Sequence, residues 1–297
     1  MNPEDTKDLM KEVRRIRVTA AKLVDEYLAG EYRSAFRGAG IEFEEVREYS
    51  AGDDVRSIDW NVSARMGRPY VKTFREERQL TIMFLIDISG SQCFGSRSLT
   101  KDNVSARLAC LLALSAVKNQ DKVGLILFDE GIETYLKPRK GSTAVWRLVR
   151  EVLRPGRKTG RTDLSAALRF LGRTQKKRAV VFLISDFMGT GYARELRTAA
   201  KMHDLVCCAV SDPAEIALPR AGVFTAYDPE SHASVLIDTD SARVRDTLAS
   251  SAREREKKME ELFCRHGIDS LKVSTASPFV GELRRLLRER RTRRKRA

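Results

Sequence analysis

The chain has 297 residues, of which 42% are hydrophobic and 32% charged, and its Lys and Arg outnumber Asp and Glu by 55 to 41. The longest apolar helix candidate, at 108–117, is too short to span a bilayer. The N-terminus mixes acids with bases around no apolar core, which excludes a secretory signal. We therefore expect a soluble, cytoplasmic protein that can bury one large or two small domains.

The first predicted element is an amphipathic helix over residues 4–28, which Gly30 closes. A stripe of this kind needs an apolar partner surface. Docking on the chain's own domain is favoured over a coiled coil with another protein, because about three heptads are marginal alone. The stripe consists of Leu9, Val13, Ile16, Ala20, Leu23 and Tyr27.

The segment 31–78 mixes glycines, turn signals, charges and single aromatics with little periodicity. Its charged residues favour an ordered polar network, since buried charges are tolerated only when they are paired. No catalytic template explains it, and we expect it either to brace the main sheet or to form a second partner surface. The predicted network pairs Asp53, Asp54 and Asp59 with Arg47, Arg56 and Arg65 around Trp60 and Tyr70.

Buried strands and helices alternate from Leu80 onward, a pattern typical of an α/β fold with a mostly parallel sheet and helices on both faces. The turn at 129–131 predicts a hairpin, so the strand after it should be an antiparallel edge strand. A second hairpin of open role is predicted within 222–239. Strands are predicted at 80–87, 122–128, 132–137, 178–185, 205–211 and 268–274, and helices at 99–118, 142–152, 163–174, 191–202 and 241–266.

Three oxygen-bearing side chains stand where the apolar run 80–86 ends. Asp87, Ser89 and Ser91 alternate along the chain, so they can point into one crevice at the carboxyl end of a buried strand. Open α/β sheets bind their ligands at that edge. Hard oxygen ligands with one negative charge suit a magnesium-type ion better than zinc or iron.

Two later residues complete the candidate metal site. Thr162 lies in a loop that opens a helix, and Asp186 ends a second buried strand. We therefore predict a site for Mg²⁺ (or Mn²⁺) at Asp87, Ser89, Ser91, Thr162 and Asp186. The alternative that these residues only cap helices and turns stays open, because Ser and Asp also mark ordinary caps.

The order Asp-x-Ser-x-Ser, a later Thr and a strand-terminal Asp resembles the metal-ion-dependent adhesion site of von Willebrand factor A domains. The resemblance implies that Ser89, Ser91 and Thr162 contact the ion directly or nearly so. It also implies that Asp87 and Asp186 act mostly through water, and that a partner's Glu or Asp fills the sixth position.

The preceding segment resembles the signature of the bacterial family called domain of unknown function 58, in which it stands immediately before a von Willebrand A strand. The resemblance runs from about Gly30 to the C-terminus. It implies a protein partner, a MoxR-type AAA+ ATPase, and a role in chaperone-like assembly. The matching strings are Gly40-x-Glu42-Phe43, Arg47-x-Tyr49-x-x-Gly52-Asp53-Asp54-x-Arg56-x-Ile58-Asp59-Trp60, Ser63-Ala64-Arg65 and Val71-Lys72-x-Phe74-x-Glu76-Glu77.

The sequence predicts four parts: an N-terminal helix at 1–30, the signature segment at 31–78, the von Willebrand factor A-like domain at 79–280 and a basic tail at 281–297. From residue 284 onward nine Lys or Arg face one Glu. A solvated, frayed end is the plainest interpretation. An acidic protein or peripheral contact with an anionic membrane are alternatives, and nucleic acid is disfavoured because no aromatic residue interrupts the tail.

Binding is favoured over catalysis. The chain has no phosphate-binding P-loop and no Gly-x-Ser-x-Gly nucleophile elbow. A metal-dependent hydrolase stays an alternative, but it needs a general base, and the nearest candidate, Asp163, also suits a helix N-terminus. The five cysteines include no C-x-x-C pair, and we expect reduced thiols, three of them in buried elements.

Overall fold

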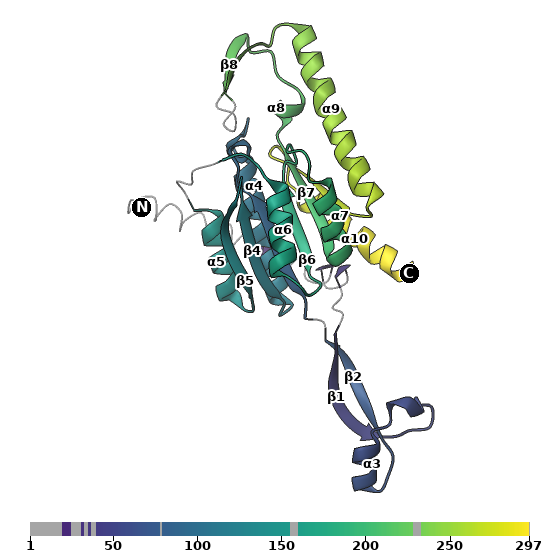
Figure 1. Ribbon diagram of the computed structural model, residues 1–297. Helices are drawn as coiled ribbons and strands as arrows, with labels where there is room; N and C mark the ends of the chain where they lie inside the picture. The colour runs from purple at the N-terminus through teal and green to yellow at the C-terminus, as the bar shows by residue number, and fades with distance from the viewer. Residues whose placement is uncertain are drawn as a thin grey trace. The chain divides into compact units, whose positions relative to one another are not determined.

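The computed structural model describes residues 20–24, 31–32, 35–36, 40–77, 79–154, 160–227 and 233–296 (Figure 1). The chain divides into a large unit, Met1–Phe36 with Thr81–Ala297, and a small unit, Arg37–Leu80. The predicted helix at 4–28 lies outside the described residues except for 20–24. The small unit begins later than the predicted 31 because Tyr32 and Phe36 are buried in the large unit, where the Tyr32 hydroxyl donates to Asp121 at 3.3 Å.

A six-stranded sheet in the order β10-β7-β6-β3-β4-β5 forms the centre of the large unit. Every neighbouring pair is parallel except β4 and β5, so the predicted antiparallel edge strand is confirmed. Each strand begins within two residues of its predicted start. The strands are β3 (Thr81–Asp87), β4 (Lys122–Phe128), β5 (Ile132–Arg139), β6 (Val180–Ser185), β7 (Asp204–Ser211) and β10 (Asp269–Ser274).

Helices cover both faces of this sheet, as the α/β pattern predicts (Figure 1). Met83 and Leu85 of β3 pack into a core that includes residues of α6 and α7. The intervening Phe84 faces the other way and stacks on Phe182 of β6 at 5.5 Å between ring centroids. No helix in the described part of the chain is long and apolar enough to cross a membrane. The helices are α4 (Lys101–Lys118), α5 (Ser142–Val152), α6 (Leu164–Thr174), α7 (Ala193–Met202), α8 (Pro213–Ile216), α9 (Ala242–Arg265) and α10 (Val280–Arg296).

The C-terminal helix α10 docks on the sheet, so the interpretation of the basic tail as a solvated, frayed end is wrong for residues 284–293. Leu283, Leu286 and Leu287 recur at helical spacing and are buried, which gives α10 an apolar face. Arg290 is also buried and contacts Asp204 at 2.5 Å and Asp269 at 2.6 Å. The basic composition concealed this short apolar stripe.

The predicted hairpin within 222–239 is confirmed as β8 (Val223–Tyr227) and β9 (Ser234–Asp238), which pair antiparallel in a sheet of their own. Val223, Tyr227, Val235 and Leu236 are exposed on it. Of the five cysteines, which all carry free thiols, Cys110, Cys207 and Cys208 are buried as expected.

The small unit is an antiparallel pair of strands, β1 (Gly40–Glu48) and β2 (Tyr70–Glu77), joined through η2 (Val55–Ser57) and α3 (Trp60–Met66). Asp59 caps α3 by accepting from the backbone N–H groups of Asn61 and Val62. Gly67 ends α3 at φ 70°, in the left-handed conformation that glycine adopts without cost.

The polar network predicted for this unit is correct in one pair and wrong in others. Arg47 contacts Asp53 through two hydrogen bonds of 2.6 and 2.8 Å, as predicted. Asp59 pairs with Lys72 at 3.1 Å rather than with an arginine, because β2 brings Lys72 beside the start of α3. Asp54 accepts from the backbone N–H of Arg56, and Trp60 is 68% exposed rather than central.

Candidate metal centre

The predicted site residues lie where the sheet changes its winding direction. β3 and β6 are neighbouring parallel strands, and the helices that follow them, α4 and α7, cover opposite faces of the sheet. The strand ends at such a switch point are where open α/β sheets bind ligands. Asp87 ends β3, and Asp186 directly follows β6.

Asp87 is a buried carboxylate held by two donors. The backbone N–H of Ser89 donates to Oδ1 at 3.0 Å, and the Ser185 hydroxyl donates to Oδ2 at 2.6 Å. Burial, and then the negative charge of Asp186, raise the pKa of Asp87 to about 7 in spite of these hydrogen bonds. Without a metal ion, the site therefore disfavours the ionised form of Asp87. A cation placed beside Asp87 and Asp186 would stabilise that ionised form.

The two predicted serines converge. Their hydroxyl oxygens lie 3.1 Å apart, and Ser89 is fully buried while Ser91 is half-buried. Ser89 and Ser91 flank Gly90, whose N–H donates to the carbonyl of Gly160 at 3.2 Å. That bond brings the loop that carries Thr162 against the Asp87–Ser91 segment.

The loop that carries Thr162 also lies close to the segment that follows Asp186. A Cβ built on Gly189 would lie 3.8 Å from the Thr162 carbonyl oxygen, so the Thr162 loop also adjoins the chain that follows Asp186. Thr162 itself is half-buried. The structure therefore brings the loops of all five predicted residues to one edge of the sheet.

The turn after β6 fixes Asp186. Phe187 has a φ of 55°, which is a genuine outlier for a bulky residue, and its buried ring packs edge-on against Phe263 at 5.1 Å. Its N–H donates to Ser185 Oγ at 3.0 Å, and Met188 N–H donates to Asp186 Oδ1 at 3.2 Å. Strained backbone of this kind persists where the surrounding packing over-determines it, and it concentrates at functional sites.

Sequence reasoning missed the partner of Asp186. Lys101, the first residue of α4, is fully buried and places its Nζ 2.7 Å from Asp186 Oδ2 and 2.5 Å from Glu215 Oε1. Burial lowers the pKa of Lys101, but the charges of Asp186 and Glu215 outweigh burial and raise it overall. A lysine at a helix N-terminus opposes the helix dipole, and that anomaly was the available signal.

Glu215 connects this lysine to α8. Its other oxygen, Oε2, accepts from the backbone N–H of Asp212 at 3.0 Å, in a capping box that begins α8. The Asp212 carboxylate accepts from Ser96 N–H and from the Thr275 hydroxyl. Although burial raises the pKa of Asp212, these hydrogen bonds lower it overall.

The donor set fits a magnesium-type ion. It combines neutral hydroxyls with carboxylates, the hard oxygen ligands that Mg²⁺ and Mn²⁺ accept. Among the residues that the structure describes, no group of three or more His, Cys, Asp or Glu side chains could hold a metal ion. A divalent ion at this edge would therefore depend on the hydroxyls of Ser89, Ser91 and Thr162.

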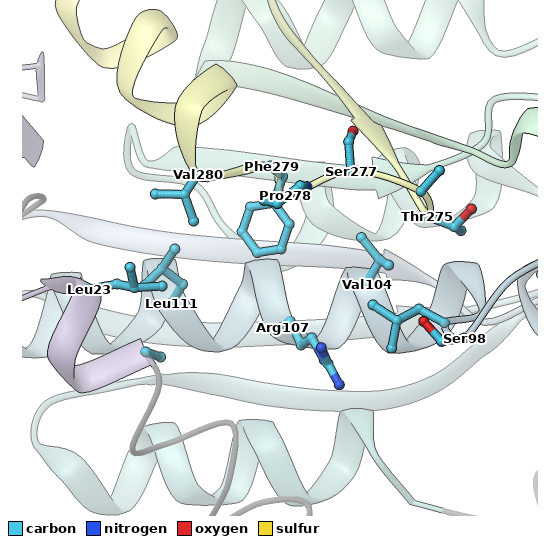
Figure 2. Close-up of a pocket in the computed structure, with 13 residues that line it drawn as sticks. Leu23, Ser98, Val104, Arg107, Leu111, Thr275, Ser277, Pro278, Phe279 and Val280 are labelled. Atoms are coloured by element: carbon cyan, nitrogen blue, oxygen red, sulfur yellow. The ribbon is translucent and has the colours of Figure 1, made fainter.

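Two other features of the large unit lie apart from this donor set. Asp163, the candidate general base, accepts from Ala166 N–H at 2.8 Å and so caps α6. A cavity of about 460 Å³ lies between α4 and the 275–280 segment, and Figure 2 shows Phe279 and Val280 facing Leu111 across it. None of the five predicted residues lines that cavity.

Solved structures with a similar fold include an aerotolerance-related membrane protein from Bacteroides fragilis, 14% identical, with 72% of this chain and 99% of that chain covered and a TM-score of 0.45. The von Willebrand factor A domain of SpRpn10 is 11% identical, with 69% and 93% covered and a TM-score of 0.38.

Among curated sequences, an uncharacterised protein of Mycobacterium tuberculosis is 27% identical over 290 residues, which cover 97% of this chain and 91% of that protein. An uncharacterised protein of Mycobacterium avium is 27% identical over 132 residues, 44% of this chain and 78% of that protein. The model of the family described as "Protein of unknown function DUF58" matches residues 45–258. Because this match covers well over half of the chain, the protein belongs to the DUF58 family, as its signature segment indicated.

Proposed function

We propose that this protein is a non-catalytic binding module that engages an acidic residue of a protein partner through a divalent ion. Ser89, Ser91 and Thr162 would hold the ion directly, with Asp87 and Asp186 behind them. A bound Mg²⁺ would supply a positive charge and an open coordination position, both of which attract a carboxylate. The convergence of the Ser89 and Ser91 hydroxyls, 3.1 Å apart beside the buried side chains of Asp87 and Asp186, carries the proposal.

The candidate metal centre is less suited to hydrolysis than to binding a ligand. Such an enzyme needs a base that activates water beside the ion. Asp163 stabilises the first turn of α6 instead, and its second oxygen lies 3.8 Å from Arg169. The donor arrangement therefore favours holding a ligand over transforming one.

The basic C-terminal helix is less suited to binding an anionic surface than its composition indicated. Arg284 and Arg288 both pair with Glu31, and Arg290 with two aspartates. These ion pairs within the chain neutralise part of the positive charge that would attract lipid or nucleic acid. We therefore do not adopt the anionic-surface alternative.

The family resemblance makes a MoxR-type AAA+ ATPase the first partner to test. The purified ATPase from the same genome would be immobilised and titrated with wild type, Asp87→Ala and Asp246→Ala, each with Mg²⁺ and with EDTA. Asp246 is an exposed residue of α9 and serves as the matched control. We expect Mg²⁺-dependent binding of wild type and Asp246→Ala, and at least about tenfold weaker binding of Asp87→Ala.

Binding that is equally strong in EDTA and with Asp87→Ala would contradict the ion-bridge mechanism, whatever the identity of the partner. Circular dichroism of Asp87→Ala checks that its loss of binding is not a loss of folding.

A further inference from the structure

Lys101 has an environment that its local structure does not explain. It is fully buried, although burying an ammonium group is unfavourable unless it is paired. It also begins α4, where the helix dipole repels a positive charge. Buried residues that break local rules usually have a reason in a nearby site. Here that site is the candidate metal centre, because Lys101 Nζ contacts Asp186 at 2.7 Å.

The two carboxylates that share the ammonium belong to different parts of the molecule. Asp186 follows β6 and belongs to the metal centre, whereas Glu215 belongs to α8. The distances from Lys101 Nζ, 2.7 Å to Asp186 and 2.5 Å to Glu215, are both short enough for charge-assisted hydrogen bonds. One positive charge therefore neutralises two carboxylates only in part.

We propose that Lys101 is the built-in counter-ion of the metal centre: its ammonium neutralises Asp186 when no divalent ion is bound and competes with that ion for the same carboxylate. When the ion binds, the ammonium is left to Glu215, so occupancy of the centre is linked to the capping box of α8. The inference rests on the proposed function only in that the centre must bind a divalent ion.

Charge explains why a competitor of this kind is useful. Without Lys101, Asp186 and Glu215 would lose the cation that offsets their negative charges in the metal-free protein. With it, the metal-free fold is stabilised, and the centre binds the ion more weakly than the bare carboxylates would. A neighbouring unit charge changes proton binding by about one to three pKa units, so its effect on a divalent ion should be about tenfold or more.

Two substitutions should therefore shift metal affinity in opposite directions. Lys101→Met removes the competing charge, and Mn²⁺ should bind about tenfold tighter than in wild type. Glu215→Gln leaves the ammonium to Asp186 alone, and Mn²⁺ should bind several-fold weaker. Lys101→Arg keeps the charge and should change affinity less than Lys101→Met does. Lys118→Met, at the exposed far end of the same helix, should leave affinity unchanged.

Stability gives a readout that does not depend on a partner. Lys101→Met should unfold at a lower temperature than wild type without metal, because it leaves Asp186 and Glu215 without their cation. Saturating Mn²⁺ should raise its unfolding temperature by more than it raises that of wild type, since a tighter ligand stabilises the folded state more.

Isothermal titration with Mn²⁺, together with thermal unfolding with and without Mn²⁺, tests this on the full chain. Failure of wild type to bind Mn²⁺ would overturn the proposed function and this inference with it. If wild type binds, equal or weaker binding by Lys101→Met would overturn the inference alone. If Lys101→Met does not fold, Glu215→Gln provides the test. Unchanged or tighter Mn²⁺ binding by Glu215→Gln would contradict the proposal that Lys101 competes with the ion for Asp186.

Discussion

Two buried cationic side chains, Lys101 and Arg290, lie at opposite ends of the strands of the six-stranded sheet. Each contacts two carboxylates. At the amino ends of β7 and β10, Arg290 contacts Asp204 and Asp269, which begin those strands. At the carboxyl ends of β3 and β6, Lys101 contacts Asp186 and Glu215. The two clusters differ in whether their charges are balanced.

The Arg290 cluster is balanced. Arg293 also pairs with Asp269, so two arginines meet two aspartates. The guanidinium of Arg290 lies over the ring of Phe36 at 4.6 Å, which adds a cation–π contact and covers it from water. Its planar fork matches two carboxylates at once. This cluster stabilises the docking of α10 and leaves nothing for a ligand to neutralise.

The Lys101 cluster is not balanced. Asp186 and Glu215 share one ammonium, so one negative charge is left over. Asp87, whose pKa the charge of Asp186 helps to raise, would supply a second negative charge once it loses its proton. Hydroxyls of Ser89 and Ser91 face the same edge. In this molecule, the buried ion pairs whose charges cancel stabilise the fold, whereas charge and oxygen ligands are left over at the candidate metal centre.

The largest effect should come from breaking the balanced cluster. Arg290→Met should lower the free energy of unfolding by about 3 kcal/mol, because it removes the cation from partly buried aspartates. Urea denaturation measures the loss, and Arg290→Lys, which keeps the charge, should lose less. Mn²⁺ affinity should equal that of wild type. A loss under about 0.5 kcal/mol would contradict a structural role for this cluster.

The next effect concerns pH in the unbalanced cluster. Because the pKa of Asp87 is raised to about 7 from its ordinary 3.8, the metal-free fold holds a proton that the unfolded chain releases. This stabilisation is complete at low pH and is lost as pH rises through about 7. The slope contributed by Asp87 should reach at most about 1.4 kcal/mol per pH unit.

Asp87→Asn should remove that contribution. Urea denaturation of both proteins in EDTA, at steps from pH 4 to pH 8, gives the difference in unfolding free energy. We expect wild type to lose stability relative to Asp87→Asn across this range. A constant difference across the range would show that Asp87 has no raised pKa.

A smaller effect isolates one predicted hydroxyl. Thr162→Val keeps the shape of the side chain and removes its oxygen, so Mn²⁺ affinity should fall by about tenfold. Thr162→Ser keeps the hydroxyl and is the matched control. Calorimetric titration of the three proteins separates the contribution of the oxygen from that of the loop. Equal affinity of wild type and Thr162→Val would remove Thr162 from the ligand set.

The smallest effect is expected for a residue in neither cluster. Trp60 in the small unit is 68% exposed, so Trp60→Ala should change the free energy of unfolding by no more than about 0.5 kcal/mol. Our hypothesis that the small unit is a second partner surface then predicts weaker capture of the ATPase by this variant. Unchanged stability together with unchanged capture would rule that hypothesis out for Trp60.

The elements of the sheet could be predicted from the sequence because buried parallel strands are continuous apolar runs. Asp87, Ser89, Ser91 and Asp186 could be placed at one edge for the same reason, since the carboxyl ends of parallel strands meet there. The position of Thr162 followed from a loop that opens a helix. Each of these predictions depends on a residue's place within its own element.

What the sequence did not reveal depends on contacts between distant elements. Lys101 and Asp186 are 85 residues apart, and Arg290 and Asp204 are 86 apart, so only the packed sheet brings them together. The same limit explains the pairing of Asp59 with Lys72, which depends on the bridge between Ile58 and Val71. Charge pairs across a fold need topology before they can be assigned.

We expect a divalent ion to bind at the carboxyl ends of β3 and β6. Anomalous diffraction from crystals of the full chain grown or soaked with Mn²⁺ tests it most directly. We expect a manganese peak at about 2.1 Å from the hydroxyl oxygens of Ser89 and Ser91. Well-ordered density for this edge of the sheet with no manganese peak there, at millimolar Mn²⁺, would contradict it.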